Sequence, residues 1–233
     1  MQVQQGDLLV DRRCLQLRAE RRADTYDERV SDEAGVAGML LAAGAGRRMG
    51  MPKALVQTGG GEPWVVRGTR VLLDSGCSPV VVVLGAGSQQ AAQLIAVAFG
   101  NEPRLIVRNA DLWAEGMSES LRAGIDALSS IELDGVIVTL VDTPSLRPET
   151  IDRVRAAADS VRSERREALV QAMFDSRPGH PVFIGRVHWA DLCEDLAGDS
   201  GARAYLRAHD ALSVECSDLE IGEDIDSAET VRP

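Results

Sequence analysis

The chain has 233 residues, a formal net charge of −11, and a composition that is 45% hydrophobic but only 3% aromatic. This length suits one α/β domain, or one domain with an appendage, and is enough to bury an aliphatic core. The acidic balance argues against a nucleic-acid or anionic-membrane surface, because those partners require a basic face. We therefore expect any anionic small-molecule substrate to be bound by a local basic cluster.

Cysteine usage and hydropathy constrain the compartment. The four cysteines lie far apart, and none forms a pair with the spacing of a zinc site or a redox motif. No run reaches ~18 uninterrupted apolar residues, and no signal peptide opens the chain. The sequence therefore predicts a cytoplasmic protein with reduced thiols and no contact with a membrane.

The first 34 residues differ from the rest of the chain. They mix both charge signs and contain few apolar positions, which is typical of a poorly ordered extension. We assign no chemistry to residues 1–34. The predicted folded domain covers residues 35–233.

From residue 35 onwards, apolar runs alternate with helical stretches. Runs that are continuously apolar indicate strands covered on both faces, and their alternation with helices indicates a largely parallel, three-layer α/β arrangement. Pro63 and Pro148 each suit the first turn of a helix, where a missing N–H does no harm. The predicted strands are 36–41, 80–84, 104–107, 135–141, 168–172 and 182–184, and the helix after Pro148 is predicted over 148–161.

The first predicted strand runs directly into a glycine-rich turn that ends at the only lysine in the chain, Lys53. Glycines allow backbone N–H groups to approach an anion without a Cβ in the way. Arg47, Arg48 and Lys53 add full positive charges beside those groups. The pattern therefore predicts a phosphate-binding loop and points to nucleotide chemistry.

Two better-known glycine motifs fit this loop less well. A P-loop needs serine or threonine after its lysine, but Lys53 is followed by Ala54. A dinucleotide fingerprint needs glycine at position 49, which is Met49, so only the spaced variant that ends at Gly50 remains. An NADP-dependent oxidoreductase and a non-catalytic nucleotide-binding protein therefore stay as alternatives.

Acidic residues follow two segments that could meet at this loop. Asp142 comes directly after the apolar run 135–141, so it should lie at the carboxyl edge of the sheet, where α/β proteins bind ligands. Such a carboxylate suits Mg²⁺, which takes oxygen ligands and bridges substrate phosphates. Asp224 and Asp226 lie in an extended segment, and we expect one of them to face inward to the metal while the other is solvated or caps the final helix. We favour Asp226.

Two further segments carry polar residues in tight turns. Residues 178–181 read Pro-Gly-His-Pro, which predicts a rigid turn that presents His180 before the strand 182–184. Residues 198–203 predict a helix start whose N–H groups could hold an anion together with Arg203. Ser118 is a natural N-cap for the helix that begins near Gly116.

Residues 41–53 read Leu-Ala-Ala-Gly-x-Gly-x-Arg-Met-Gly-x-Pro-Lys. This loop closely resembles the signature of nucleotidyltransferases that activate cofactors and sugars. Within that superfamily the chain most resembles molybdenum cofactor cytidylyltransferases and the MobA-like family, from about residue 35 to the C-terminus. The resemblance implies a three-layer α/β/α sandwich with a mostly parallel mixed sheet, as in nucleotide-diphospho-sugar transferases.

The resemblance also implies a reaction, in which Mg²⁺ assists the transfer of CMP from CTP to molybdopterin with release of pyrophosphate. Asp142-Thr143-Pro144 is closer to the guanylyltransferase form, so transfer of GMP stays open, as does a sugar or alditol phosphate as acceptor. Handover of the product to a molybdoenzyme or its chaperone would follow. The implied catalytic residues are Arg47, Lys53 and Asp142; the nucleotide-binding residues are Leu41, Ala42, Ala43, Gly44, Gly46, Arg47, Lys53, Gly85 and Ser118; the acceptor-binding residues are His180 and Arg203; and the metal ligands are Asp142 and Asp226.

Overall fold

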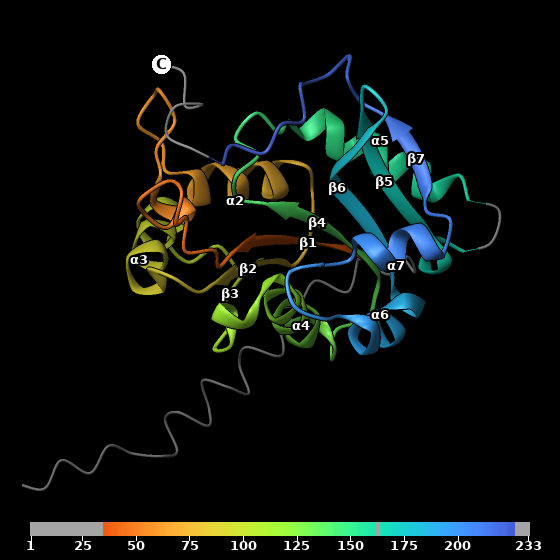
Figure 1. Cartoon of the computed structure of the whole chain (residues 1–233), viewed down its shortest axis with the longest axis horizontal. Coiled ribbons are helices and arrows are strands. Elements are labelled where there is room, and N and C mark those ends of the chain that lie inside the picture. The colour runs from red at the N-terminus through yellow and green to blue at the C-terminus, as the bar shows by residue number, and fades with distance from the viewer. Residues whose placement is uncertain (1–34, 162–163, 227–233) are drawn as a thin grey trace, which may run out of the picture. The chain divides into compact units, whose positions relative to one another are not determined.

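The computed structural model describes residues 35–161 and 164–226. Within them, seven strands form one sheet in the order β3-β2-β1-β4-β6-β5-β7 (Figure 1). The predicted extension, residues 1–34, lies outside the described residues. The strands are β1 Gly35–Ala42, β2 Val80–Leu84, β3 Leu105–Asn109, β4 Leu133–Leu140, β5 Leu169–Phe174, β6 Arg177–Gly185 and β7 Leu212–Glu215.

The sheet is mixed but mostly parallel. β1 pairs in parallel with β2 and β4, β2 with β3, and β5 with β7. Only β6 is antiparallel to its neighbours β4 and β5. β1 and β2 are fully apolar and almost wholly buried, as expected of strands covered on both faces. The predicted sheet type is confirmed.

Helices cover both faces of this sheet (Figure 1). One buried cluster joins the sheet to α2, α3 and α5, and a second joins it to α4, α6 and α7. Pro63 directly precedes α2 and Pro148 opens α5, as predicted. The three-layer α/β/α arrangement is therefore confirmed. The helices are α2 Trp64–Asp74, α3 Ser88–Phe99, α4 Met117–Leu128, α5 Pro148–Asp159, α6 Trp189–Asp195 and α7 Arg203–Ala208, with short 3-10 turns at Lys53–Leu55, Trp113–Glu115, Arg165–Glu167 and Arg186–His188.

The strand order creates a switch point beside β1. The chain leaves β1 and builds β2 and β3 on one side, and then crosses to place β4 on the other. At such a point the loops after two neighbouring parallel strands diverge and leave a crevice at their carboxyl ends. Here those loops are the glycine-rich turn after β1 and the segment that begins with Val141 and Asp142. The fold thus brings together the two main predicted motifs.

Two local predictions were wrong. Residues 178–181 lie inside β6 and not in a turn; the hairpin turn lies earlier, at Asp175 and Ser176, which both have positive φ. Ser118 does not cap α4, because the N-cap position is Gly116 and Ser118 is a buried helical residue. Among the described residues, no helix has both the length and the apolar character needed to cross a membrane.

Candidate functional site

The loop after β1 folds back on itself to reach Lys53. Gly46 has φ +59, and a Cβ there would overlap the carbonyl of Met51, so only glycine fits this position. The amide of Met49 donates to the carbonyl of Gly46 at 2.9 Å. The loop is also tied to the next strand, since the amide of Ala86 donates to the carbonyl of Ala43 at 3.0 Å. These contacts bring Lys53 back over the carboxyl end of β1.

Lys53 lies between two carboxylates that come from distant parts of the chain. Its Nζ is 2.5 Å from Oδ2 of Asp142 and 2.7 Å from Oδ1 of Asp226. The side chains of Lys53 and Asp142 are only 15% and 14% exposed, whereas that of Asp226 is 47% exposed. Arg48 pairs with the other oxygen of Asp226 at 2.9 Å. The glycine loop, β4 and the C-terminal segment therefore converge on one ammonium group.

The charges at this point stabilise one another. Burial lowers the pKa of Lys53, but hydrogen bonds and charge interactions with Asp142 and Asp226 outweigh burial, so its pKa is raised above 10.5. The hydrogen bond from Lys53 holds the pKa of Asp226 below its ordinary value, and Arg48 adds to this effect. Lys53 is therefore an ammonium and Asp226 a carboxylate at neutral pH.

The donor set suits a hard divalent cation. Oδ1 of Asp142 is buried and has no hydrogen-bond partner among the described residues, and an unpaired buried carboxylate oxygen is costly unless a cation meets it. Asp226 lies across from it, bridged by Lys53. Mg²⁺ is commonly held by one or two carboxylates together with substrate phosphates. Within the described ranges, no group of three or more histidine, cysteine, aspartate or glutamate side chains is placed to hold a metal ion.

A cavity of about 460 Å³ opens beside this ion-pair cluster. Its lining combines the glycine loop, the end of β4 and the start of α4. Arg47 is exposed along its rim. Of the predicted nucleotide and metal residues, it is lined by Leu41, Ala43, Gly44, Gly46, Arg47, Lys53, Asp142 and Asp226.

A second cavity of about 240 Å³ adjoins the first and shares Leu41, Met117, Leu140 and Asp199 with it. It contains both predicted acceptor residues, His180 and Arg203. It also contains Asp224, so the two candidate aspartates are separated: Asp226 faces the first cavity and Asp224 the second.

His180 and Asp224 have opposite pKa shifts. Desolvation lowers the pKa of His180, against the effect of its hydrogen bond with the carbonyl of Val138 at 3.3 Å. Desolvation raises the pKa of Asp224, and repulsion by Asp142 raises it further, while His180 and Lys53 oppose the shift. His180 is therefore neutral at pH 7, and because its Nδ1–H donates to the carbonyl of Val138, its Nε2 is left to accept one hydrogen bond from a bound group.

The predicted nucleotide-binding residues Ala42, Gly85 and Ser118 do not line the first cavity. Ala42 is buried at the end of β1. Gly85 packs against Trp113: a Cβ at position 85 would be 2.6 Å from the indole and 2.7 Å from the carbonyl of Ala43. Ser118 is 1% exposed, and its amide donates to the carbonyl of Gly198 at 3.1 Å. These residues support the walls of the cavity without lining them.

Trp113 and Asp199 are among the lining residues that the sequence analysis did not assign to the site. Trp113 lies in the 3-10 turn before α4 and forms part of the first cavity. Asp199 lies between the two cavities. A lone aromatic residue in a chain that is only 3% aromatic is a signal that could have identified Trp113, whereas the placement of Asp199 depends on the close approach of the loop before α7 to Gly116.

Comparison with known proteins places this geometry in context. Residues 38–212 match the family model described as "MobA-like NTP transferase domain". "Nicotine blue oxidoreductase" from Paenarthrobacter nicotinovorans is 38% identical over 201 residues, which is 83% of this chain and 93% of that protein. A "probable molybdenum cofactor guanylyltransferase" from Mycobacterium bovis (strain BCG / Pasteur 1173P2) is 29% identical over 86% of this chain and 94% of its own length.

A solved structure shares the fold. Rv0371c from Mycobacterium tuberculosis H37Rv, in a complex with manganese, superposes with a TM-score of 0.58 at 20% identity, covering 79% of this chain and 88% of that one. At this identity the likeness extends to the fold alone.

Proposed function

Because the chain belongs to the MobA-like NTP transferase family, a family of nucleotidyltransferase enzymes, we propose that it transfers CMP from CTP to a phosphorylated acceptor and releases pyrophosphate. We further propose that molybdopterin is the acceptor, that the reaction takes place in the cytoplasm, and that the product passes to a molybdoenzyme or its chaperone. The choice of CTP rests on the sequence of the loop 41–53 and on the residues around His180 and Arg203.

A single observation carries the proposal: the ammonium of Lys53 lies under the glycine loop between the carboxylates of Asp142 and Asp226. Lys53 has three N–H donors, and two of them meet these carboxylates. The third is available for a phosphate oxygen. Arg47, exposed on the rim of the same cavity, supplies a second cation for the triphosphate.

The chemistry then needs no protein nucleophile. A phosphate oxygen of the acceptor attacks the α-phosphorus of CTP, the bond to the bridging oxygen breaks, and pyrophosphate leaves with that electron pair. Lys53 and Arg47 stabilise the negative charge that develops on the leaving group. The adjoining cavities hold donor and acceptor in line, so that catalysis comes from positioning and charge neutralisation.

Asp142 and Asp226 would hold a divalent ion, which supplies Lewis-acid charge neutralisation at the triphosphate. The unpaired buried oxygen of Asp142 supports this assignment. We propose Mg²⁺ as the ion in the cell. The manganese complex of the fold neighbour supports a divalent ion without fixing its identity.

The second cavity is the proposed acceptor site. It opens next to the first, so a bound phosphate there could reach the α-phosphate of the nucleotide. Arg203 offers a charged donor for that phosphate, and neutral His180 can accept a hydrogen bond from a polar group of the acceptor.

The test is pyrophosphate release by the full chain with Mg²⁺, molybdopterin, and CTP and GTP in competition. We expect CMP product to exceed GMP product by more than tenfold, about 1.4 kcal/mol in specificity, because a pocket shaped for a pyrimidine excludes a purine by size. A product dominated by GMP would overturn the choice of base alone. Pyrophosphate release only with a sugar or alditol phosphate would overturn the choice of acceptor.

A second candidate is a reductase that uses NADPH, favoured by one observation: the 38% identical relative bears the name of an oxidoreductase. The ion pairs of Lys53 with Asp142 and Asp226 are also compatible with a nucleotide site that works without a metal. Titration of NADPH, followed by its fluorescence, separates the two candidates. NADPH binding without pyrophosphate release from any nucleoside triphosphate would favour the reductase.

A further inference from the structure

The C-terminal segment 216–226 carries Asp226 from the far edge of the sheet to the ion-pair cluster. It begins directly after β7, the outermost strand, and crosses to Asp142 on the central strand β4. We call residues 216–226 the strap. The side chain of Asp226 forms ion pairs with Lys53 and Arg48, and it is about half exposed. The backbone of the strap sets where this side chain starts, and the two ion pairs then hold its carboxylate.

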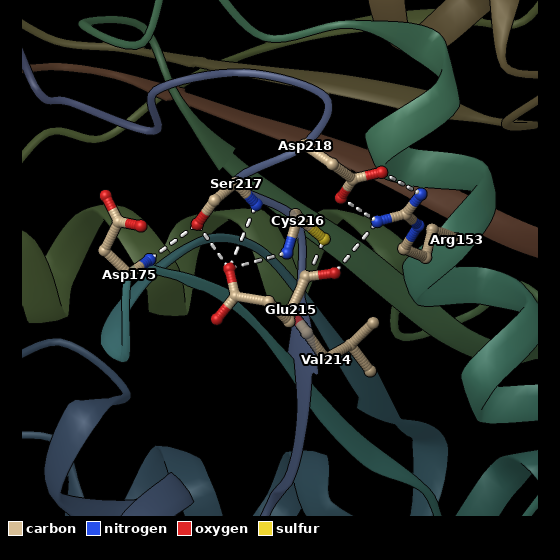
Figure 2. A network of polar contacts seen from close by, with 7 residues as sticks. All are labelled: Arg153, Asp175, Val214, Glu215, Cys216, Ser217 and Asp218. Atoms are coloured by element: carbon tan, nitrogen blue, oxygen red, sulfur yellow. Dashed lines mark hydrogen bonds and ion pairs between the residues drawn. The ribbon is translucent and has the colours of Figure 1, made fainter.

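Polar contacts fix the start of the strap (Figure 2). Arg153 of α5 forms a bidentate pair with Asp218, at 2.5 and 2.9 Å, and also donates to the carbonyl of Glu215 at 2.9 Å. The amide of Asp175, in the β5-β6 hairpin turn, donates to the hydroxyl of Ser217 at 2.6 Å. These contacts hold the first turn of the strap against both α5 and the hairpin.

A glycine fixes the middle of the strap. Gly222 has φ +66, and a Cβ at this position would overlap the ring of Phe174, which is 2% exposed. Gly179, the neighbour of His180 in β6, lies against the same ring, since a Cβ there would be 2.8 Å from it. The strap and β6 therefore both pack against the ring of Phe174. Three residues after Gly222, the amide of Ile225 donates to the carbonyl of Asp142 at 2.9 Å.

We propose that Gly222, seated on Phe174, is the positioning residue that sets the place of Asp226 beside Asp142, and so sets the affinity of the site for a divalent cation. Nothing larger than hydrogen fits between the strap and the ring. A side chain at position 222 would lift the strap and move Asp226, only four residues further on. This inference rests on the proposed function only in that Asp142 and Asp226 are taken as the metal ligands.

The experiment measures Mn²⁺ binding by electron paramagnetic resonance, alone and with CTP, so that no turnover is needed. Gly222→Ala should weaken Mn²⁺ binding at least tenfold while the protein stays folded. The matched control is Gly61→Ala: Gly61 also has positive φ, +82, but open space around the position of a Cβ. Because both substitutions strain the backbone, and only one meets an aromatic ring, Gly61→Ala should leave Mn²⁺ binding within about twofold of the parent.

A double variant tests the contact itself. Phe174→Ala removes Cγ, Cδ1 and Cδ2, the three atoms that a Cβ at position 222 would meet, so Gly222→Ala combined with Phe174→Ala should regain most of the lost Mn²⁺ affinity. If Gly222→Ala does not fold, Asp218→Ala cuts the exposed anchor shown in Figure 2 and should weaken Mn²⁺ binding about threefold. Its control, Asp152→Ala, removes a similar pair from the same helix and should have no effect.

Parent-like Mn²⁺ affinity in folded Gly222→Ala, or in Asp218→Ala where Gly222→Ala does not fold, would overturn the inference. So would a parent protein that binds no Mn²⁺ with or without CTP. If instead the variants change Mn²⁺ binding as expected but the parent releases no pyrophosphate with any acceptor, the proposed function fails and the positioning role stands.

Discussion

The two adjoining cavities are built in different ways. The first is formed where parallel strands β1 and β4 end, and its charged groups neutralise one another across short distances. The second is formed by the antiparallel strand β6, the strap and the loop before α7, and its His180 and Asp224 are partly desolvated and shifted away from their charged forms. This difference fits the proposed function, in which the first cavity would bind the triphosphate and the second the acceptor.

The largest expected effect comes from the centre of the first cavity. Lys53→Ala should lower the rate of pyrophosphate release at least tenfold, equivalent to about 1.4 kcal/mol of transition-state stabilisation, because both the proposed phosphate contact and the bridge to two aspartates are lost. The control is Arg203→Ala in the second cavity, which should raise the KM for acceptor and spare the KM for CTP. If both variants changed the KM for CTP equally, the two cavities would not have distinct substrates.

Asp142→Asn tests whether Asp142 is a ligand of the divalent ion. The amide keeps the shape of the side chain but is a weaker ligand for a hard cation, so activity should fall several-fold and the Mg²⁺ concentration for half-maximal activity should rise. Asp224→Asn is the control, since Asp224 lies in the second cavity. An Asp142→Asn titration that overlays the parent curve would show that Asp142 is a structural turn residue.

Replacing His180 should have a smaller effect on the kinetics. His180→Ala should raise the KM for acceptor several-fold with little change in the KM for CTP, because the imidazole lines only the second cavity. Initial rates with each substrate varied in turn provide the measurement. An effect confined to CTP would place His180 with the nucleotide.

The smallest expected effect concerns stability in acid. Desolvation lowers the pKa of His180 in the folded protein, so below its ordinary pKa of 6.5 the unfolded chain binds a proton that the folded chain resists, and stability falls as the pH falls. His180→Gln should therefore show a shallower loss of Tm between pH 7 and pH 5 than the parent does. Parallel Tm profiles would indicate that His180 stays solvated.

Motifs carried by contiguous residues could be predicted, whereas the contacts between distant segments that hold these motifs in place could not. The strand 80–84 and the loop that ends at Lys53 were visible because apolar runs and glycine spacing are local signals. The strand at residues 178–181 was hidden, because glycine and proline favour turns, while here tertiary packing dominates: Gly179 is needed for contact with Phe174. Ser118 shows the same limit, since a natural capping residue lies buried inside α4.

The division of Asp224 and Asp226 between the two cavities could not be predicted from the sequence either. The sequence analysis favoured Asp226 over Asp224 as the partner of Asp142, and in the structure Asp226 lines the first cavity and Asp224 the second. Which one meets Asp142 depends on where the strap is anchored, and that depends on Arg153, Phe174 and the hairpin turn. These contacts join residues that are 40 to 70 positions apart, so no pattern within a short stretch of sequence predicts them.

The solitary lysine gives the protein a built-in chemical reporter. Apart from the α-amino group at the start of the chain, Lys53 carries the only primary amine. Because its raised pKa keeps it protonated and its carboxylate partners shield it, an acylating reagent at neutral pH should modify it slowly in the folded protein and much faster after unfolding. A single mass increment on one peptide would then record how often the ion-pair cluster around Lys53 opens. A protease that cleaves after lysine would report the same event by cutting the chain at one place.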